Sequence, residues 1–241
     1  MDYKAEIDNR VKWIKDLLIK SKAKGIVYGN SGGKDSALVG ILSKIATDNV
    51  TSIIMPCDSK RNYSIDRDHA YLIAAKYNIK TIEVDLTDAK ASLKKAYIPN
   101  IPDNNTMAYN NINPRLRMIT LYTYAQSNNY LVAGTGNLSE ATMGYFTKYG
   151  DGAHDFNPIA DLTVTEIFAI LKYIGCPNEI IDKAPSAGLY EGQTDEGEMG
   201  ITYKEIDEYI RTGHSLRADF IEERKKATAH KRALPHTYKV K

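Results

Sequence analysis

One glycine-rich turn constrains the fold of this 241-residue chain more than any other feature. Residues 25–28 are short and apolar, and Gly-Asn-Ser-Gly-Gly-Lys-Asp-Ser follows them at residues 29–36. Apolar residues then recur at helical spacing over residues 37–45, which predicts a helix. Glycines let a strand turn tightly into a helix and let the backbone approach a ligand closely. The free N–H groups at the helix start, and its positive dipole end, then make an anion site.

This turn is neither of two better-known phosphate motifs. Walker A needs a glycine where this chain has Tyr28 and a Ser or Thr where it has Asp35, and no Gly-x-Gly-x-x-Gly is present. The turn matches Ser-Gly-Gly-x-Asp-Ser, which is typical of enzymes that split ATP into AMP and pyrophosphate. A carboxylate beside phosphates requires a cation, which indicates Mg²⁺. We therefore expect the ATP-binding residues to include Gly29, Asn30, Ser31, Gly32, Gly33, Lys34, Asp35 and Ser36.

Strand and helix patterns alternate along the first half of the chain. Strands are expected at residues 25–28, 52–55, 81–86 and 130–134, with helices near 66–77, 87–96 and 115–127 between them. This order predicts an α/β fold, with a mostly parallel sheet covered by helices on both faces. Residues 99–114 are rich in Asn and Pro and read as a long loop. Capping boxes at Thr163/Glu166 and Thr202/Glu205 start two later helices, and a charged helix is expected over about 214–230. We expect residues 1–241 to form a single domain.

The amino-acid composition limits the partners and the cellular setting that can be expected for this chain. Hydrophobic residues make up 43% and charged residues 26%, an ordinary globular balance. A formal net charge of +2 gives no support for nucleic-acid binding. No apolar run approaches the roughly 20 residues that cross a bilayer, and the charged N-terminus is not a signal peptide. Cys57 and Cys176 are too far apart in sequence to suggest a disulfide framework, so we expect a reduced, cytoplasmic setting.

Several further segments resemble the ammonia-dependent NAD synthetase family. They lie at residues 134–140, 144–152, 155–162, 185–196 and 230–235. The resemblance covers nearly the whole chain in the family's order. It implies a Rossmann-like, doubly wound parallel sheet of the adenine nucleotide alpha-hydrolase type, and a homodimer.

The resemblance implies that the chain converts nicotinic acid adenine dinucleotide (deamido-NAD), ATP and ammonia to NAD, AMP and pyrophosphate. The charge of a carboxylate repels a nucleophile, and oxide is a poor leaving group. Attack of the carboxylate on the α-phosphate of ATP would give an acyl-adenylate, from which ammonia displaces AMP. Catalysis would then be mainly charge neutralisation and positioning. With 241 residues the chain has no room for a glutamine-hydrolysing domain, so we expect free ammonia or another protein as the source.

The resemblance also implies residue roles. Asp35 and Glu140 would be the catalytic Mg²⁺ ligands, because each follows the C-terminal end of a predicted parallel strand, where ligands collect. Thr135 and Ser186 would contact ATP, although such hydroxyls commonly only cap helices. The resemblance also implies that five charged or basic residues contact deamido-NAD: Arg115, Lys148, Asp155, His230 and Lys231. The plainer interpretation of these five is surface charge or a basic helix end.

Two departures and two rival functions stay open. Val164 stands where the family usually has a lysine for ATP, and Lys34 is the obvious substitute cation. Arg61 could also reach ATP, and residues 185–200 are expected to be mobile without ligand. One rival is a tRNA-modifying or sulfur-transferring ATP pyrophosphatase, which would need an RNA-binding surface and often paired cysteines, and the sequence gives evidence of neither. The other is a non-catalytic nucleotide-binding descendant, for which Val164 is the supporting feature.

Overall fold

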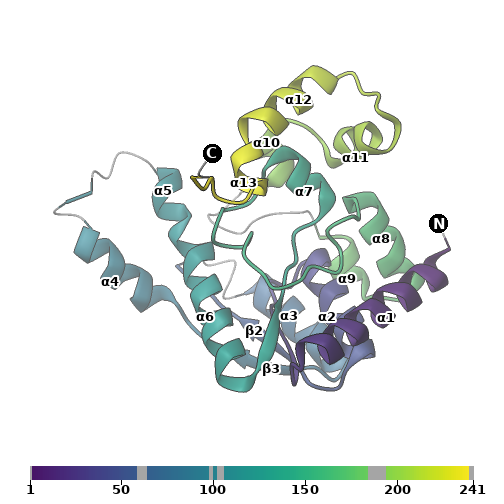
Figure 1. The fold of residues 1–241 in the computed structure, drawn as a ribbon, viewed down its shortest axis with the longest axis vertical. Helices are drawn as coiled ribbons and strands as arrows, with labels where there is room; N and C mark the ends of the chain where they lie inside the picture. Colours follow the sequence, from purple (N-terminus) through teal and green to yellow (C-terminus); the bar gives the residue numbers. More distant parts are fainter. Residues whose placement is uncertain (1, 59–63, 98–99, 102–105, 184–193, 239–241) are drawn as a thin grey trace.

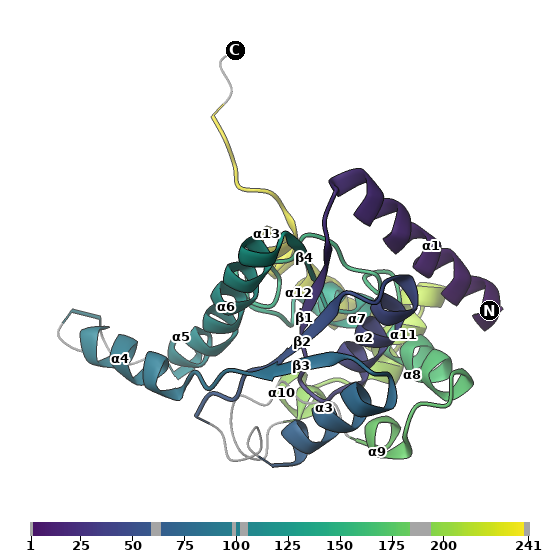
Figure 2. The ribbon, with the colours of Figure 1, turned by 90° about the horizontal axis from the view of Figure 1, so that it is seen from below.

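The protein, described here by a computed structural model of residues 2–58, 64–97, 100–101, 106–183 and 194–238, is built on one parallel sheet. Figure 1 shows this sheet among the helices that surround it. Its strands are β1 (Gly25–Gly29), β2 (Val50–Ile54), β3 (Lys80–Glu83) and β4 (Tyr130–Ala133), in the order β3-β2-β1-β4 (Figure 2). Tyr28 of β1 is in register with Ser52 of β2 on one side and with Ala133 of β4 on the other. The chain builds outward from β1 to β3 and then returns to β4. The strand order therefore reverses between β1 and β4, where open α/β sheets bind ligands.

Helices cover both faces of this sheet, as the sequence predicts. Figure 2 shows α4 to α6 on one side and α1, α2, α3, α8 and α9 on the other. The helices are α1 (Tyr3–Ser21), α2 (Lys34–Ala46), α3 (Ile65–Lys76), α4 (Thr87–Tyr97), α5 (Thr106–Asn110), α6 (Ile112–Asn128), α7 (Leu138–Met143), α8 (Val164–Tyr173), α9 (Asn178–Ile181), α10 (Asp195–Met199), α11 (Tyr203–Thr212), α12 (Ala218–Ala227) and α13 (Ala229–Arg232). The doubly wound α/β architecture is thus confirmed.

Strand β1 is buried on both faces, which explains its continuous apolar sequence. Ile26 and Tyr28 point into a core shared with α1, α2 and α8, whereas Val27 points into a second core with Ile53 and Val132. Successive side chains of a strand alternate between faces, so one five-residue strand anchors both layers. The loop that leaves β1 therefore starts from a strand that is fixed on both faces.

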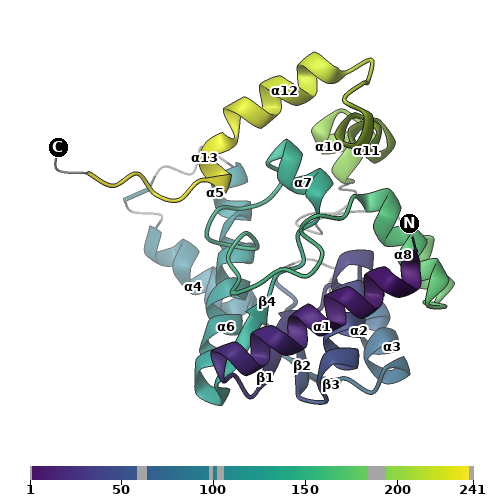
Figure 3. The ribbon, with the colours of Figure 1, turned by 45° about the vertical axis from the view of Figure 1, so that its right-hand side comes forward.

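A third apolar cluster joins α7 and α8 to the helices near the C-terminus (Figure 3). Both predicted capping boxes are present, with Thr163 accepting from Glu166 N and Thr202 accepting from Glu205 N. The cluster holds α7 close to α11 and α12, beside the carboxyl ends of β1 and β4. It consists of Met143, Val164, Met199, Ile201, Tyr203, Ile206 and Ile221.

The prediction of a long loop over residues 99–114 is wrong from residue 106 onward. Helix α5 occupies Thr106–Asn110, and α6 begins at Ile112, three residues earlier than the expected 115. Pro114 lies in the first turn of α6, where its missing N–H has no intrahelical partner to lose. Tyr109 and Ile112 are buried, so packing overrides the weak helical pattern of this Asn-rich stretch. The last predicted helix is likewise divided, into α12 and α13.

Across the described residues, no helix combines the length and the apolar character needed to span a bilayer. Both cysteines, Cys57 and Cys176, are buried and free.

Candidate functional site

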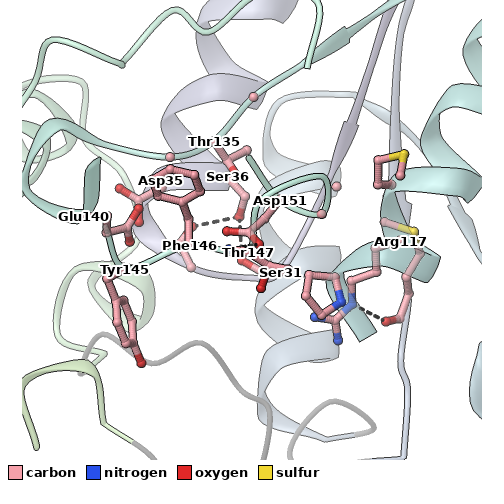
Figure 4. A pocket seen from close by; sticks show the side chains of 18 of the residues that line it. Ser31, Asp35, Ser36, Arg117, Thr135, Glu140, Tyr145, Phe146, Thr147 and Asp151 are labelled. Carbon is pink, nitrogen blue, oxygen red and sulfur yellow. Dashed lines mark hydrogen bonds between the residues drawn. The ribbon is translucent and has the colours of Figure 1, made fainter. Parts of the chain in front are cut away.

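A cavity of about 910 Å³ lies at the carboxyl ends of the strands, where the loops after β1 and β4 face each other (Figure 4). The loop after β1 forms one wall, and residues 133–136 and 144–153 form another. One face of α6, the first turn of α3 and the end of β2 also line it, together with residues of α5, α10, α12 and α13. This volume is at the upper end of the range of about 300–1,000 Å³ for small-molecule sites. The cavity thus suits large ligands at the switch point of the sheet.

The turn after β1 is shaped by its backbone and by one buried asparagine. Gly32 has φ +65°, and a Cβ there would lie 2.1 Å from the carbonyl oxygen of Asp66, so only glycine fits. Asn30 accepts a hydrogen bond from Gly32 N at 3.2 Å and donates to the Ala70 carbonyl at 3.1 Å. These bonds pack the turn against α3. The turn is therefore built before any ligand arrives.

Helix α2 starts directly after this turn and points its N-terminus along the cavity wall. Gly33 is the N-cap and offers no side chain, so the first N–H groups of α2 are not capped by it. The hydroxyls of Ser31 and Ser36 lie 3.2 Å apart, and Ser36 also donates to the Gly33 carbonyl at 3.0 Å (Figure 4). Uncapped N–H groups, a helix dipole and two hydroxyls form a site for a phosphate anion.

Two carboxylates meet beside this turn, and Asn137 joins them. The Asn137 amide donates to Asp35 Oδ1 at 3.1 Å, while its backbone N–H donates to Glu140 Oε2 at 3.1 Å. Asn137 Oδ1 also accepts from Glu140 N at 2.9 Å, which completes the capping box of α7. Burial, and then the nearby charge of Asp35, raise the pKa of Glu140 well above its ordinary value. Two carboxylates this close share the site at a cost unless a cation joins them.

These residues fit a magnesium ion. Mg²⁺ takes hard oxygen ligands and is usually held by one or two carboxylates together with substrate phosphates. Asp35 and Glu140 provide two such carboxylates next to the phosphate turn, and both line the cavity. Within the described part of the chain, no group of three or more Asp, Glu, His or Cys side chains is placed to hold a metal. The arrangement therefore suits an ion that arrives with a phosphate ligand.

Lys34, at the start of α2, is buried next to this pair. Its Nζ lies 2.8 Å from Asp35 Oδ2 and 5.9 Å and 5.4 Å from the ring centroids of Phe168 and Tyr203. Val164 is also buried, one helical turn before Phe168 on α8. The ammonium of Lys34 thus lies over the face of α8 that carries Val164.

Several further charged residues line the cavity and are not among the predicted site residues, and Arg117 and Asp151 are two of them. Arg117 of α6 donates from Nε to the Met55 carbonyl at 3.2 Å, at the end of the cavity away from Glu140 (Figure 4). Asp151 faces the cavity and accepts from Thr147 N at 2.9 Å. Burial among the surrounding walls lowers the pKa of the Arg117 guanidinium and raises the pKa of the Asp151 carboxyl. The cavity therefore offers a cation and a proton acceptor besides the two carboxylates that we expect to hold a metal.

Comparison with known proteins settles the family. The sequence model of the family described as NAD synthase matches residues 6–239. The chain belongs to the NAD synthase family. It is 44% identical over 241 residues to the NH(3)-dependent NAD(+) synthetase of Carboxydothermus hydrogenoformans, covering 98% of this chain and 97% of the relative.

Solved structures agree with this membership. The fold matches the structure of NMN synthetase from Francisella tularensis with a TM-score of 0.93 and 36% identity, over 100% of both chains. It matches the NH3-dependent NAD synthetase from Campylobacter jejuni with a TM-score of 0.78 and 30% identity, over 99% of this chain and 100% of that one. The fold expected from the resemblance is thus the fold of solved NAD synthases.

The structure gathers most of the ATP residues expected for this family in one place. Every predicted residue of the turn except Gly32 lines the cavity, and Gly32 shapes the turn from behind. Thr135, in the loop after β4, lines the opposite wall (Figure 4). Ser186 and Arg61, and most of the segment 185–200 expected to be mobile, lie outside the described residues.

The residues expected to contact the dinucleotide divide into two groups. Lys231 lines the cavity and donates to the carbonyls of Gly144 and Phe146, at 2.7 and 2.8 Å, so it braces the turn after α7. The other four do not line the cavity: Arg115, Lys148, Asp155 and His230.

Three of these four are joined outside the cavity. Lys148 Nζ donates to the His230 carbonyl at 2.7 Å, and Arg115 donates to the Lys148 carbonyl at 3.4 Å. Asp155 instead accepts from Val132 N at 2.8 Å, which holds the loop to β4. Their contact with substrate remains a prediction, and Asp155 has a structural role in addition.

The sequence predicts Arg115 as a substrate contact, whereas Arg117 is the arginine of α6 that lines the cavity. Residues two apart on a helix point in different directions, so only one of these arginines can face the cavity. The signal was present in the helical phase: Leu121, one turn after Arg117, also lines the cavity. Asp151 lies within residues 144–152, one of the segments that carry the family resemblance. The sequence alone does not show that Asp151, and not the nearby Asp155, lines the cavity.

Proposed function

We propose that this member of the NAD synthase family is an ammonia-dependent ligase that adenylates a nicotinate nucleotide and then forms its amide. The observation that carries the proposal is the Asp35–Asn137–Glu140 arrangement beside the phosphate turn, on the wall of one large cavity. It offers a place for Mg-ATP with room for a second ligand. The family membership supports this reaction over tRNA-modifying or sulfur-transferring ATP pyrophosphatases. Retention of both carboxylates supports a catalytic protein over a non-catalytic descendant.

In the first step, the turn and the N-terminus of α2 hold the phosphates of ATP. Asp35 and Glu140 would hold Mg²⁺, which supplies positive charge to the phosphates when bound. A carboxylate oxygen of the substrate attacks the α-phosphorus, and the bond to the β,γ-pyrophosphate breaks. The N–H groups and hydroxyls of the turn donate hydrogen bonds to the leaving pyrophosphate, and the positions of these donors are fixed before the reaction begins.

In the second step, ammonia attacks the carbonyl carbon of the acyl-adenylate, and AMP leaves with one of the two original carboxylate oxygens. Ammonium is the main form at neutral pH and cannot act as a nucleophile until it loses a proton. Asp151 is suited to accept that proton, because it faces the cavity and its pKa is raised toward the working range of a general base. The amide product then carries no negative charge at the reacting carbon.

Deamido-NAD is the substrate that the NAD synthetase relatives indicate. A second candidate is nicotinic acid mononucleotide. The observation in its favour is the match to the Francisella tularensis NMN synthetase, whose TM-score of 0.93 exceeds the 0.78 of the Campylobacter jejuni NAD synthetase. Both substrates present the same nicotinate carboxylate, so the chemistry of the cavity is shared. They differ in whether an adenylate half must be bound as well.

Steady-state assays with each acid distinguish the two candidates. Purified protein is given Mg-ATP, ammonium and either deamido-NAD or nicotinic acid mononucleotide, and the amide and pyrophosphate are measured. We expect a higher kcat/KM for deamido-NAD. A higher value for the mononucleotide would make the chain an NMN synthetase instead. Failure to form either amide by folded protein would contradict the proposed ligase activity.

Three further properties belong to the proposal. A homodimer is expected from the family resemblance and is tested by light scattering of the purified protein. Two buried, free cysteines suit a reducing cytoplasm. The whole chain is proposed to act as one domain with no nucleic-acid partner, consistent with its net charge of +2.

A further inference from the structure

Lys34 forms an ion pair with Asp35, one of the two carboxylates that we expect to hold the metal ion. Its ammonium contacts Asp35 Oδ2 at 2.8 Å, and only 6% of its side chain is exposed. Asp35 thus forms an ion pair with a buried cation.

Two aromatic rings also stabilise the ammonium group of Lys34. The rings of Phe168 and Tyr203 both lie within 6 Å of Nζ, a distance at which aromatic rings attract a cation. Tyr203 is fixed in turn, because its hydroxyl donates to Asp195 Oδ2 at 2.9 Å. Both rings belong to helices of the third apolar cluster or pack against it.

We infer that Lys34 is a resident counter-ion that competes with free metal for Asp35 and moves to the phosphates when Mg-ATP binds. Two positive charges cannot share the same carboxylate oxygen without mutual repulsion, which is strong where water is excluded. Free metal must therefore displace the ammonium at a cost. A metal that arrives on ATP brings phosphate oxygens, and these give the displaced ammonium a new partner.

This inference rests on the proposed function only for the identity of the site, and it is tested without the acid substrate or ammonia. The variant Lys34→Met keeps a flexible apolar chain beside the two rings but removes the charge. Lys44→Met is the matched control, because Lys44 lies on the same helix and forms an ion pair with Asp48 at 2.9 Å. Neither Lys44 nor Asp48 lines the cavity. Binding of free Mn²⁺ is measured by electron paramagnetic resonance, and binding of Mn-ATP by calorimetry.

The expected changes have opposite signs. Lys34→Met should bind free Mn²⁺ about tenfold more tightly than the unaltered protein, and Mn-ATP about tenfold more weakly, which is about 1.4 kcal/mol each way. Lys44→Met should change neither. A merely structural lysine would weaken both or neither. Unchanged or weaker binding of free Mn²⁺ by folded Lys34→Met would overturn the inference.

A second measurement covers the case in which Lys34→Met does not fold. A crystal structure of the unaltered protein with Mn-ATP should show Lys34 Nζ more than about 4 Å from Asp35, beyond ion-pair distance, and next to a phosphate oxygen. An ammonium that stays on Asp35 in that complex would overturn the inference. Neither result depends on whether the acid substrate is a dinucleotide or a mononucleotide.

Discussion

The side-chain amide of Asn137 donates a hydrogen bond to Asp35 Oδ1 at 3.1 Å, and this bond links the loops after β1 and β4 across the cavity. The two residues are far apart in sequence but adjacent at the edge of the sheet, because β1 and β4 are paired. Asn137 is fully buried, so its amide has no alternative partner in solvent. The bond therefore fixes the relative positions of the two carboxylates that we assign to the metal.

Replacing Asn137 with Ala should weaken both the fold and the metal site. Loss of an N-cap side chain costs about 0.5–2 kcal/mol of unfolding free energy. Thr202→Ala is the control, since Thr202 forms the same capping box on α11, where its hydroxyl contacts Glu205 and not Asp35. Both variants should lose similar stability in urea titrations. Only Asn137→Ala should need more Mg²⁺ for half-maximal turnover, and an equal Mg²⁺ requirement in both would contradict the bridging role.

Asp35→Asn and Glu140→Gln should each lower kcat by about 100-fold or more, as expected when groups that stabilise transition-state charge are removed. Glu140→Gln should not lower the melting temperature of the metal-free protein, because the charge of Glu140 is unfavourable at its buried position. Asp48→Asn, which alters an exposed carboxylate on another loop, is the control. Near-normal turnover in both site variants would refute their assignment.

Arg117 and Arg115 should differ in what they recognise. A lost charge-assisted hydrogen bond costs about 1.5–3 kcal/mol, so Arg117→Met should lower kcat/KM roughly tenfold to a hundredfold with either nicotinate substrate. Arg115→Met should impair only deamido-NAD, because Arg115 lies outside the cavity. The check is a kcat/KM comparison of the two variants with both acids. If Arg115→Met impaired the mononucleotide as strongly as Arg117→Met does, the division between inner and outer residues would be wrong.

The pKa shifts predict opposite pH effects for two aspartates. The pKa of Asp151 is raised by burial, so its charge destabilises the fold at neutral pH, and that cost disappears as pH falls below the unfolded value of 3.8. The pKa of Asp161 is lowered by its hydrogen bond with Arg10, so Asp161 stabilises the fold above 3.8 and loses that effect as pH falls through its folded pKa.

Replacing each of these aspartates with asparagine tests the direction of its effect on the free energy of unfolding. Asp151→Asn keeps the oxygen that accepts from Thr147 and should be at least as stable as the unaltered protein at pH 7. Asp161→Asn should be less stable by about 1 kcal/mol or less, because the Asp161 side chain is 71% exposed. In urea titrations, the Asp151 difference should shrink as pH falls toward 4, whereas the Asp161 difference should persist at pH 4 and shrink only as pH falls further, through the folded pKa of Asp161. A large loss of stability for Asp151→Asn at pH 7 would contradict the assigned direction.

The sequence predicts the sheet and the phosphate turn because both depend on local pattern, and the assignment of Asp35 and Glu140 to a metal remains a prediction. Strand–turn–helix order places Asp35, and parallel pairing places Glu140 beside it. What it does not predict depends on packing between distant segments. Nothing in the Asn-rich residues 99–114 signals that Tyr109 and Ile112 are buried. The choice between Arg115 and Arg117 likewise needs the phase of α6 against the cavity, and the contact of Lys34 with Phe168 needs the docking of α8 on α2.

Transfer of a labelled oxygen tests the central claim, adenylation of the substrate carboxylate, most directly. The acid that supports turnover is prepared with ¹⁸O in its carboxylate and incubated with the protein, Mg-ATP and ammonium, and AMP is analysed by mass spectrometry. The acyl-adenylate route predicts one ¹⁸O atom in each AMP formed, with one pyrophosphate released per amide. Unlabelled AMP, or ADP and phosphate in its place, would contradict the route.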